Sequence, residues 1–295
     1  MTGVLLVDKP SGMTSHDVVD RVRKATGIRR VGHTGTLDPN ATGLLVICLG
    51  KATRLSEHLT GLDKEYEGTM RFGMVTESYD SDGLVTEEHP VPELTIPGIQ
   101  EICDRFVGQI DQLPPMVSAV KVGGERLYKI ARKGEVVERT PRRVTVHEFK
   151  VLEYTAPDAL IRVRCTSGTY VRALCHDVGQ IIGCGAILAS LRRTRVGKHS
   201  VADAIQLDDL TTPEIARERM MPMGLALDFP EVIIKPSSNA LVMSGGALSP
   251  RDLIKPCLET EGWVQVKTDS GRLIALGLLE ASAAGSRIHA KRVFD

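Results

Sequence analysis

The 295-residue sequence predicts an α+β fold with a large N-terminal domain and a small C-terminal β-barrel. Up to about residue 212, apolar residues at helical spacing alternate with shorter runs of strand periodicity. A proline-bounded linker follows at residues 213–229. From Glu231 onward the pattern changes to short strands and tight turns. We therefore expect one domain at residues 1–229 and a second at residues 231–295.

The first elements follow from local signals. Residues 4–7 predict a short strand, and the next helix is capped by Thr14 or Ser15 and ended by Gly27. The apolar run at residues 44–49 has the length of a strand and no polar position, which is typical of a strand buried on both faces.

The later elements are predicted in the same way. Residues 66–72 alternate as an antiparallel strand does, and a helix begins at Pro97. Two strands join near Ala156, a helix starts after Thr169 as its cap, and a further strand is expected at residues 186–196.

Charge is segregated along the chain although the formal net charge is +0. Residues 57–104 hold twelve acidic and two basic residues, whereas residues 121–143 hold eight basic and three acidic ones. The basic stretch contains a predicted short helix through Leu127 and Ile130 that stops at Gly134. From charge alone, a solvated helix face and a polyanion-binding surface are equally good interpretations.

Composition excludes several classes of protein. No apolar run approaches the ~20 residues of a membrane span, and residues 4–7 are too few for a signal peptide, so we expect a soluble cytoplasmic protein. The six cysteines form no C-x-x-C pair. Cys175, His176 and Asp177 with Cys184 are a poor metal set, because adjacent helical residues point in different directions. We therefore expect no metal.

One loop is unusually rich in turn formers. Residues 32–43 contain three glycines, three threonines, one proline and a single carboxylate, Asp38, ahead of the apolar run. Asp38 either closes an Asx-type turn before Pro39 or is a carboxylate held on a rigid platform for chemistry. The segment at residues 32–43 is not a phosphate-binding loop, since it lacks the Lys-Ser or Lys-Thr that ends the G-x-x-x-x-G-K frame.

A second informative stretch, residues 165–174, combines a strand end, a turn at Gly168 and a helix start. Arg172 falls in the first turn of that helix, where a cation does not favour the helix dipole. It is either a surface arginine or one that pairs with an anion elsewhere in the molecule.

With these pieces in place, the chain resembles the TruB family, the bacterial-type tRNA pseudouridine-55 synthases. Four separated blocks match in order and spacing: Lys9–Ser15, Gly32–Gly43, Lys64–Tyr66, and Ser167–Arg172 with Asp177–Gly179 behind it. The resemblance implies a pseudouridine synthase catalytic domain, with a mixed, largely antiparallel central sheet flanked by helices. It also implies a PUA-like RNA-binding β-barrel after Glu231 and an RNA-gripping insertion at about residues 121–143.

The activity implied by the resemblance is isomerisation of uridine 55 in the T-loop of tRNA. The N-glycosidic bond is cut, uracil rotates, and C5 is joined to the ribose. This reaction requires no cofactor and no metal. The expected partner is the T-arm of tRNA, with no membrane and no obligatory protein partner.

The resemblance also implies roles for individual residues. Asp38 takes the position of the nucleophile, and Arg172 that of the cation which pairs with it and keeps it ionised. Tyr66 would stack on a flipped-out uridine and is the family's candidate for moving a proton.

Further positions surround this centre. His33 either supports the extruded nucleotide or braces its loop, and Tyr170 and Leu191 are expected to line the base pocket. Lys9 and Pro10 are expected to brace that pocket. The expected phosphate contacts of the basic stretch are Arg132, Arg142 and Arg143.

Two other functions stay open at this point. An RNA chaperone or binding module would use the basic stretch and the barrel, but it has no need for Asp38, Tyr66 and Arg172 together. A hydrolase of nucleosides or glycosides would require a second carboxylate near Asp38. Within the four blocks Asp177 is the candidate for that second carboxylate.

Overall fold

The computed structural model describes residues 1–295 except 117–120, 123–124, 127–136, 256–260, 281–285 and 295. The expected helix through Leu127 and Ile130, and Arg132 with it, lie outside the described residues. The α-helices are α1 (Ser15–Thr26), α2 (Ser56–Thr60), α3 (Ile96–Asp104), α5 (Val171–Ile182), α6 (Pro213–Arg219) and α7 (Asn239–Met243).

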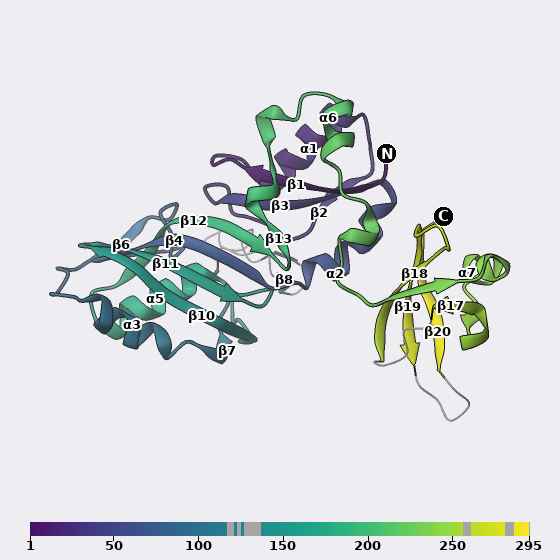
Figure 1. The fold of residues 1–295 in the computed structure, drawn as a ribbon. Coiled ribbons are helices and arrows are strands. Elements are labelled where there is room, and N and C mark those ends of the chain that lie inside the picture. The colour runs from purple at the N-terminus through teal and green to yellow at the C-terminus, as the bar shows by residue number, and fades with distance from the viewer. Residues whose placement is uncertain (117–120, 123–124, 127–136, 256–260, 281–285, 295) are drawn as a thin grey trace.

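Most strands of the N-terminal part join one ten-stranded sheet with the order β14–β1–β3–β12–β4–β11–β10–β7, to which β2 and β13 add at β3 and β12 (Figure 1). Its pairs β1–β14 and β3–β12 are parallel and the others are antiparallel, which confirms the mixed, largely antiparallel sheet. The strands are β1 (Gly3–Lys9), β2 (Val31–His33), β3 (Thr42–Leu49), β4 (Lys64–Phe72), β7 (Gly108–Gln112), β10 (Arg142–Thr155), β11 (Asp158–Cys165), β12 (Ala186–Val196), β13 (His199–Ser200) and β14 (Ile205–Gln206).

The two halves of this sheet meet where β3 pairs with β12. The pairing is short, with Thr42 opposite Arg192 and Gly43 opposite Arg193. Gly43 has a φ of +100°, and a Cβ there would lie 2.3 Å from the carbonyl oxygen of Arg193. Only glycine fits this close approach of two backbones. The loop that carries Asp38 runs directly into this junction.

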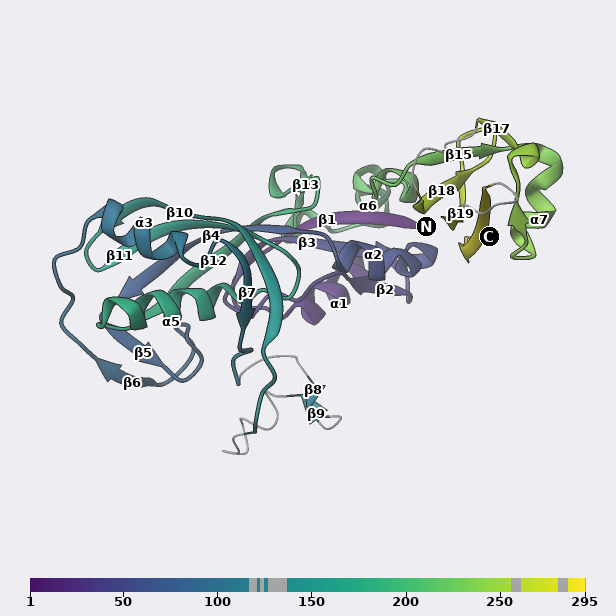
Figure 2. The same ribbon diagram turned by 90° about the horizontal axis from the view of Figure 1, so that it is seen from below.

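Different helices cover the two halves of the sheet. Helices α3 and α5 pack on β4, β10, β11 and β12 around a core that contains Phe72, Phe149 and Leu174. Helix α1 packs on β1 and β3, where its Val18 and Val22 are fully buried. Figure 2 shows α5 below the sheet, together with the hairpin of β5 (Met74–Thr76) and β6 (Val85–Glu88).

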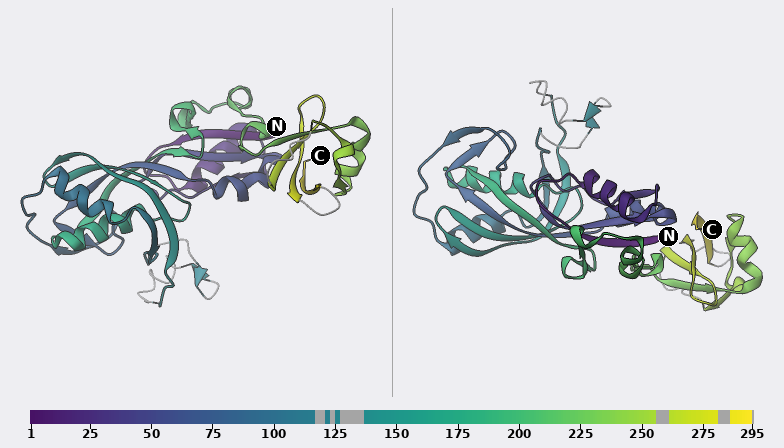
Figure 3. Two further views of the ribbon diagram at one scale, coloured as in Figure 1. Left: turned by 60° about the horizontal axis from the view of Figure 1, so that its bottom comes forward. Right: turned by 90° about the horizontal axis from the view of Figure 1, so that it is seen from above.

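A second sheet begins at Glu231, where the sequence changes character. Its six strands have the order β16–β20–β19–β18–β15–β17, a half-barrel arrangement that is consistent with a PUA-like domain. Figure 3 shows it beside the half of the large sheet that contains β1, at the end far from β5 and β6. Its strands are β15 (Glu231–Ile234), β16 (Ala247–Leu248), β17 (Leu253–Lys255), β18 (Gly262–Lys267), β19 (Leu273–Glu280) and β20 (Arg287–Val293).

The second sheet packs against the first through a shared apolar core. The Trp263 ring of β18 meets the His58 ring of α2 edge to face, with centroids 4.4 Å apart, and stacks near Phe229 of the connecting segment. The Gln265 side-chain amide donates to the carbonyl oxygens of Leu227 and Phe229. These contacts fix the C-terminal sheet to the segment that precedes it.

The sequence-based boundaries were correct in most places and wrong at one cap. Strand β12 covers the expected residues, and all of β3 after Thr42 is buried. Thr169, however, does not cap α5, because Tyr170 occupies that position without a side-chain bond and the Thr169 hydroxyl donates to the Thr166 carbonyl. In the described part of the chain no helix is long and apolar enough to cross a membrane.

Asp177, in the middle of α5, leads to a test of stability against pH. Burial raises the pKa of its carboxyl from 3.8 to about 6. The folded protein therefore binds this proton more tightly than the unfolded chain, and the free energy of unfolding falls as the pH rises between these values. Asp177→Asn should increase the free energy of unfolding at pH 7 by about 1–3 kcal/mol.

Urea unfolding of both proteins at several pH values measures this effect. The gain should shrink at pH 5 and vanish below about pH 3, where both states hold the proton. An equal gain at every pH would show that the charge of Asp177 is not its cause.

Candidate active site

The Asp38 loop borders a cavity of about 240 Å³ at the junction of the sheet halves. This volume lies below the ~300–1,000 Å³ of ordinary ligand pockets, so it suits a single ring system. Four separate parts of the chain supply most of its lining: the loop before β3, strand β4, the turn from β11 into α5, and strand β12. Of the residues singled out from the sequence, the cavity brings together Asp38, Tyr66, Tyr170, Arg172 and Leu191.

The Lys9 side chain anchors the Asp38 loop to the end of strand β1. The side chain is completely buried at the end of β1, and its Nζ donates to the carbonyl oxygens of Pro10, Pro39 and Ala41 at 2.9, 2.9 and 2.6 Å. Burial lowers the pKa of Lys9 to about 8, and the nearby Asp38 carboxyl opposes that change. The expectation that Lys9 braces the pocket is thus met by three charge-assisted hydrogen bonds.

The turn after β1 adds further anchors. The Leu37 amide donates to Ser15 Oγ at 2.9 Å, and the Gly12 amide donates to the Pro39 carbonyl at 3.0 Å. The sequence block around Lys9 and the block around Asp38 are therefore hydrogen-bonded to each other in the fold. This contact gives a physical reason for their occurrence together.

Arg193 braces the loop from β12. The side chain is 1% exposed, and its Nε and Nη2 donate to the carbonyls of Leu44 and Gly35. It also faces Tyr66: burial raises the pKa of the Tyr66 hydroxyl, while the charge of Arg193 opposes the rise. The phenol of Tyr66 is therefore neutral near pH 7.

Arg172, in the first turn of α5, lies between two carboxylates. Its Nη1 donates to Asp80 Oδ2 at 2.6 Å, and its Nη2 lies 3.8 Å from Asp38 Oδ2. The side chains of Arg172 and Asp80 are 6% and 14% exposed, whereas that of Asp38 is 52% exposed. The interpretation of Arg172 as a partner of an anion is correct, but its closer partner is Asp80.

Asp38 is the accessible carboxylate of this group. Loss of solvent around it raises the pKa of Asp38, Arg172 opposes that rise, and the charges of Asp80 and Asp82 add to it. Because the carboxyl is half exposed, we regard these effects as partly screened by water. The site thus holds one accessible carboxylate beside a buried ion pair.

Sequence reasoning missed Asp80. It lies in the β5–β6 connection, in a run of Asp, Ser and Gly that predicts only a turn, 92 residues before Arg172. Its Oδ1 accepts hydrogen bonds from Ser78 Oγ and from the Asp82 amide. The available signal was charge: a buried arginine requires a buried carboxylate, and the acidic stretch could supply one.

The remaining expected residues lie elsewhere. His33 is absent from the described residues that line the cavity; its Nδ1 is buried without a hydrogen-bond partner, and burial lowers its pKa. Arg142 and Arg143 start β10, both exposed, and Arg143 pairs with Asp111 of β7 at 3.2 Å. Asp177 does not line the described cavity.

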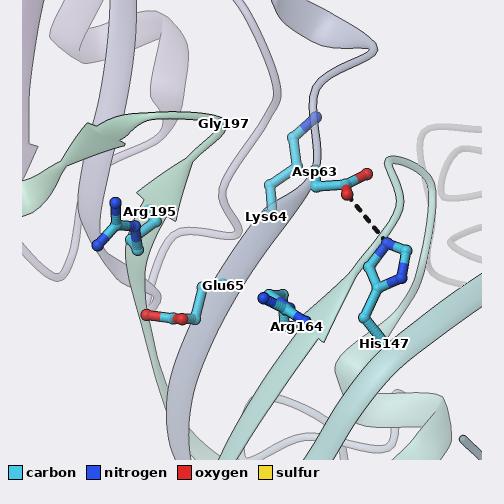
Figure 4. Close-up of a pocket in the computed structure, with 7 residues that line it drawn as sticks. All are labelled: Asp63, Lys64, Glu65, His147, Arg164, Arg195 and Gly197. Carbon is cyan, nitrogen blue, oxygen red and sulfur yellow. Dashed lines mark ion pairs between the residues drawn. The ribbon is translucent and has the colours of Figure 1, made fainter.

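A larger cavity of about 570 Å³ lies at the start of β4, towards the opposite face of the sheet (Figure 4). Glu65 is the register partner of both Arg164 and Arg195, so these three side chains share one face, while Tyr66 points to the other. His147 and Asp63 form an ion pair of 2.9 Å at its rim. Its described lining includes neither Asp38 nor Arg172, so we assign the chemistry to the smaller cavity.

Among the described residues, no group of three or more His, Cys, Asp or Glu side chains could hold a metal ion. The smaller cavity offers the chemistry of three side chains. These are an accessible carboxylate, a guanidinium that stabilises its ionised form, and a neutral phenol on the wall.

Two family profiles match the chain. Residues 23–171 match the N-terminal domain of the TruB family pseudouridylate synthases, and residues 172–228 match the C-terminal domain of tRNA pseudouridylate synthase B. The two matches meet within the first turn of α5, between Val171 and Arg172.

Curated relatives and solved structures agree with these profiles. A tRNA pseudouridine synthase B of Pelotomaculum thermopropionicum is 40% identical over 97% of this chain and 92% of its own, and one of Opitutus terrae is 52% identical over 76% and 93%. A chain in the crystal structure of a Cbf5–Nop10–Gar1 complex has a TM-score of 0.76 and 30% identity, covering 99% of this chain and 85% of that chain. A chain in an H/ACA RNP bound to a substrate RNA containing 2'-deoxyuridine has a TM-score of 0.75 and 28% identity, with coverage of 99% and 85%.

The shared arginine leads to a prediction for the pKa of Asp38. Asp80→Asn removes a negative charge that raises this pKa and frees Arg172 to pair with Asp38, so the pKa of Asp38 should fall. Titration of the aspartate carboxyl carbons by NMR, with the Asp38 signal identified from its loss in Asp38→Asn, measures the change.

Asp82→Asn is the matched control, because it removes a neighbouring charge without releasing Arg172. It should lower the pKa of Asp38 less than Asp80→Asn does. Equal shifts in the two variants would mean that the Arg172–Asp80 pair has no specific influence on Asp38.

Proposed function

Because the chain belongs to the TruB family of pseudouridylate synthases, we propose that it isomerises uridine 55 in the T-loop of tRNA to pseudouridine. The observation that carries the proposal is the meeting of Asp38, Tyr66 and Arg172 at one cavity from three distant parts of the chain. A binding module gains nothing from this arrangement, whereas an isomerase requires it. We infer that the enzyme acts on its tRNA substrate in the cytoplasm.

Asp38 is the proposed nucleophile. Its ionised carboxylate attacks the substrate and forms a covalent intermediate while the bond between ribose C1' and uracil N1 breaks. After uracil rotates, C5 bonds to C1' while the bond between Asp38 and the substrate breaks and restores the carboxylate. The C5 proton leaves and N1 gains a proton, so the reaction is an isomerisation without a redox change. The exposure of Asp38 and the nearby Arg172 guanidinium support attack by the ionised form.

Tyr66 is proposed to stack on the flipped base. A uridine within a folded loop must leave its stack to be reached, at a cost of a few kcal/mol that aromatic stacking partly offsets. The raised pKa of Tyr66 favours a neutral phenol, so stacking is better supported than proton abstraction by a phenolate. Tyr170 and Leu191 complete the proposed base pocket.

RNA contacts are proposed outside this pocket. The exposed Arg142 and Arg143, with Arg132, are suited to phosphate groups of the T-arm. We further propose that residues 1–229 form the catalytic domain and residues 231–295 an RNA-binding domain, with His33 bracing the active-site loop. No protein partner enters the proposed reaction.

A hydrolase is less well supported. Its second carboxylate would have to act as a free acid or base. Asp80 is the carboxylate that shares Arg172 with Asp38, but it is buried and held by Arg172, Ser78 and the Asp82 amide. It is therefore suited to hold a guanidinium rather than to exchange a proton with substrate.

The first test uses Asp38→Asn, which keeps the size of the side chain but removes its charge and its attacking oxygen. Pseudouridine formation in an unmodified tRNA transcript should vanish, while tRNA affinity should change little because binding relies on phosphates. Chemical mapping of pseudouridine and a binding assay on one preparation give both quantities. A normal yield at position 55 would remove Asp38 from catalysis.

The second test concerns the basic residues at the start of β10. Arg142→Gln with Arg143→Gln should weaken tRNA binding and lower the slope of log K against log salt by roughly two, about one for each phosphate contact. The matched control is Arg164→Gln with Arg195→Gln, which removes two charges from the opposite face of the sheet. An unchanged slope in the first pair, or an equal loss in both, would contradict these contacts.

A further inference from the structure

Tyr79, the residue before Asp80, has an unfavourable backbone conformation. Its φ of +65° is the one positive value found for a described residue other than glycine. A side chain as large as tyrosine in this left-handed region costs roughly 1–3 kcal/mol, and the surrounding structure must offset this cost. Glycine would adopt the same φ without strain. The Tyr79 ring must therefore contribute something that glycine lacks.

The ring stacks on His176 of α5. The two ring centroids are 3.9 Å apart and the planes are inclined by 18°. His176 lies four residues after Arg172, so both side chains leave the same face of the helix one turn apart. His176 Nδ1 is buried without a hydrogen-bond partner, so this nitrogen does not fix the ring in another orientation.

Backbone contacts fix the same segment. The Leu188 amide of β12 donates to the Tyr79 carbonyl at 3.0 Å, and the Tyr79 amide donates to the Thr76 carbonyl at 3.2 Å. The segment is thus attached to β12 through its backbone and to α5 through two side-chain contacts: Tyr79 on His176, and Asp80 on Arg172.

We propose that the stacked pair Tyr79–His176 is a positioning clamp that sets the Asp80 carboxylate and, through it, the direction in which Arg172 faces Asp38. Neither Tyr79 nor His176 touches the reacting atoms, so both are positioning residues that act through Asp80 and Arg172. With Asp80 fixed at 2.6 Å from Nη1, the Nη2 edge of the guanidinium is turned towards Asp38 Oδ2 at 3.8 Å. This inference rests on the proposed function for its kinetic readout only.

Four variants test the clamp. Tyr79→Phe keeps the ring, Tyr79→Gly removes the ring and also relieves the backbone, and His176→Ala removes the other half of the stack. The fourth places Tyr79→Gly in the Asp80→Asn background. The quantities measured are the single-turnover rate of pseudouridine formation at saturating enzyme, the Kd for tRNA, and the urea midpoint.

The expected rates follow from the geometry. Tyr79→Phe should retain the wild-type rate, whereas Tyr79→Gly and His176→Ala should each slow the single turnover about ten-fold, because small misplacements of a catalytic group are costly. The Kd should not change. In the Asp80→Asn background Tyr79→Gly should cause no additional loss, because the clamp acts through Asp80.

Tyr154→Ala is the control for a purely structural role. Tyr154 packs on the same core as α5, and its ring centroid lies 6.2 Å from that of Phe72. It belongs to strand β10 and not to the β5–β6 connection that carries Tyr79 and Asp80. It should lower the urea midpoint without altering the single-turnover rate. The clamp is overturned if Tyr79→Gly lowers only the urea midpoint, or if it slows the reaction equally with and without Asp80.

A readout independent of the reaction separates the two proposals. In NMR titrations Tyr79→Gly should lower the pKa of Asp38 in the direction expected for Asp80→Asn, whereas Tyr79→Phe should leave it unchanged. If the wild-type protein forms no pseudouridine, the proposed function fails, and this titration alone decides the clamp. An unchanged pKa of Asp38 in Tyr79→Gly would then overturn it.

Discussion

The buried ammonium group of Lys9 is the interaction on which the active-site geometry depends. Burying a charge is costly, and three backbone carbonyls offset the cost by pointing at one Nζ. Two of them belong to the residues that follow Asp38, so the loop is tied to the end of β1. Arg193 repeats the arrangement from the other side with carbonyls of Gly35 and Leu44. The Asp38 carboxylate is thus displayed by a loop whose Gly35, Pro39 and Ala41 carbonyls accept hydrogen bonds from two buried cations.

Asp80 and Asp38 have different roles because their carboxylates are buried to different extents. Asp80 is enclosed and satisfies the arginine, whereas Asp38 remains open to the cavity. A guanidinium has two edges, and one edge here serves a fixed ion pair while the other faces the accessible carboxylate. The pair with Asp80 thus orients the Arg172 guanidinium through groups of the protein itself.

Local patterns predicted the local structure, while long-range contacts could not be read from them. The apolar run of β3, the glycine at the end of α1 and the bounds of β12 follow from periodicity and turn chemistry, and the structure agrees. Motif resemblance brought Asp38, Tyr66 and Arg172 together before any fold was known. Asp80 was missed because its own neighbourhood predicts only a turn, and its partner lies in a helix far along the chain. The cap of α5 was misassigned because a threonine and a tyrosine are adjacent there and only backbone geometry distinguishes them.

Trp263 is the single tryptophan of the chain, and it lies where the C-terminal sheet meets the N-terminal part. Its half-buried indole forms a cluster with the His58 and Phe229 rings, which also contact each other. Indole emission shifts to longer wavelengths when water reaches the ring. The protein therefore carries an intrinsic fluorescent reporter, in which separation of the C-terminal sheet from its neighbour would be visible without any attached label.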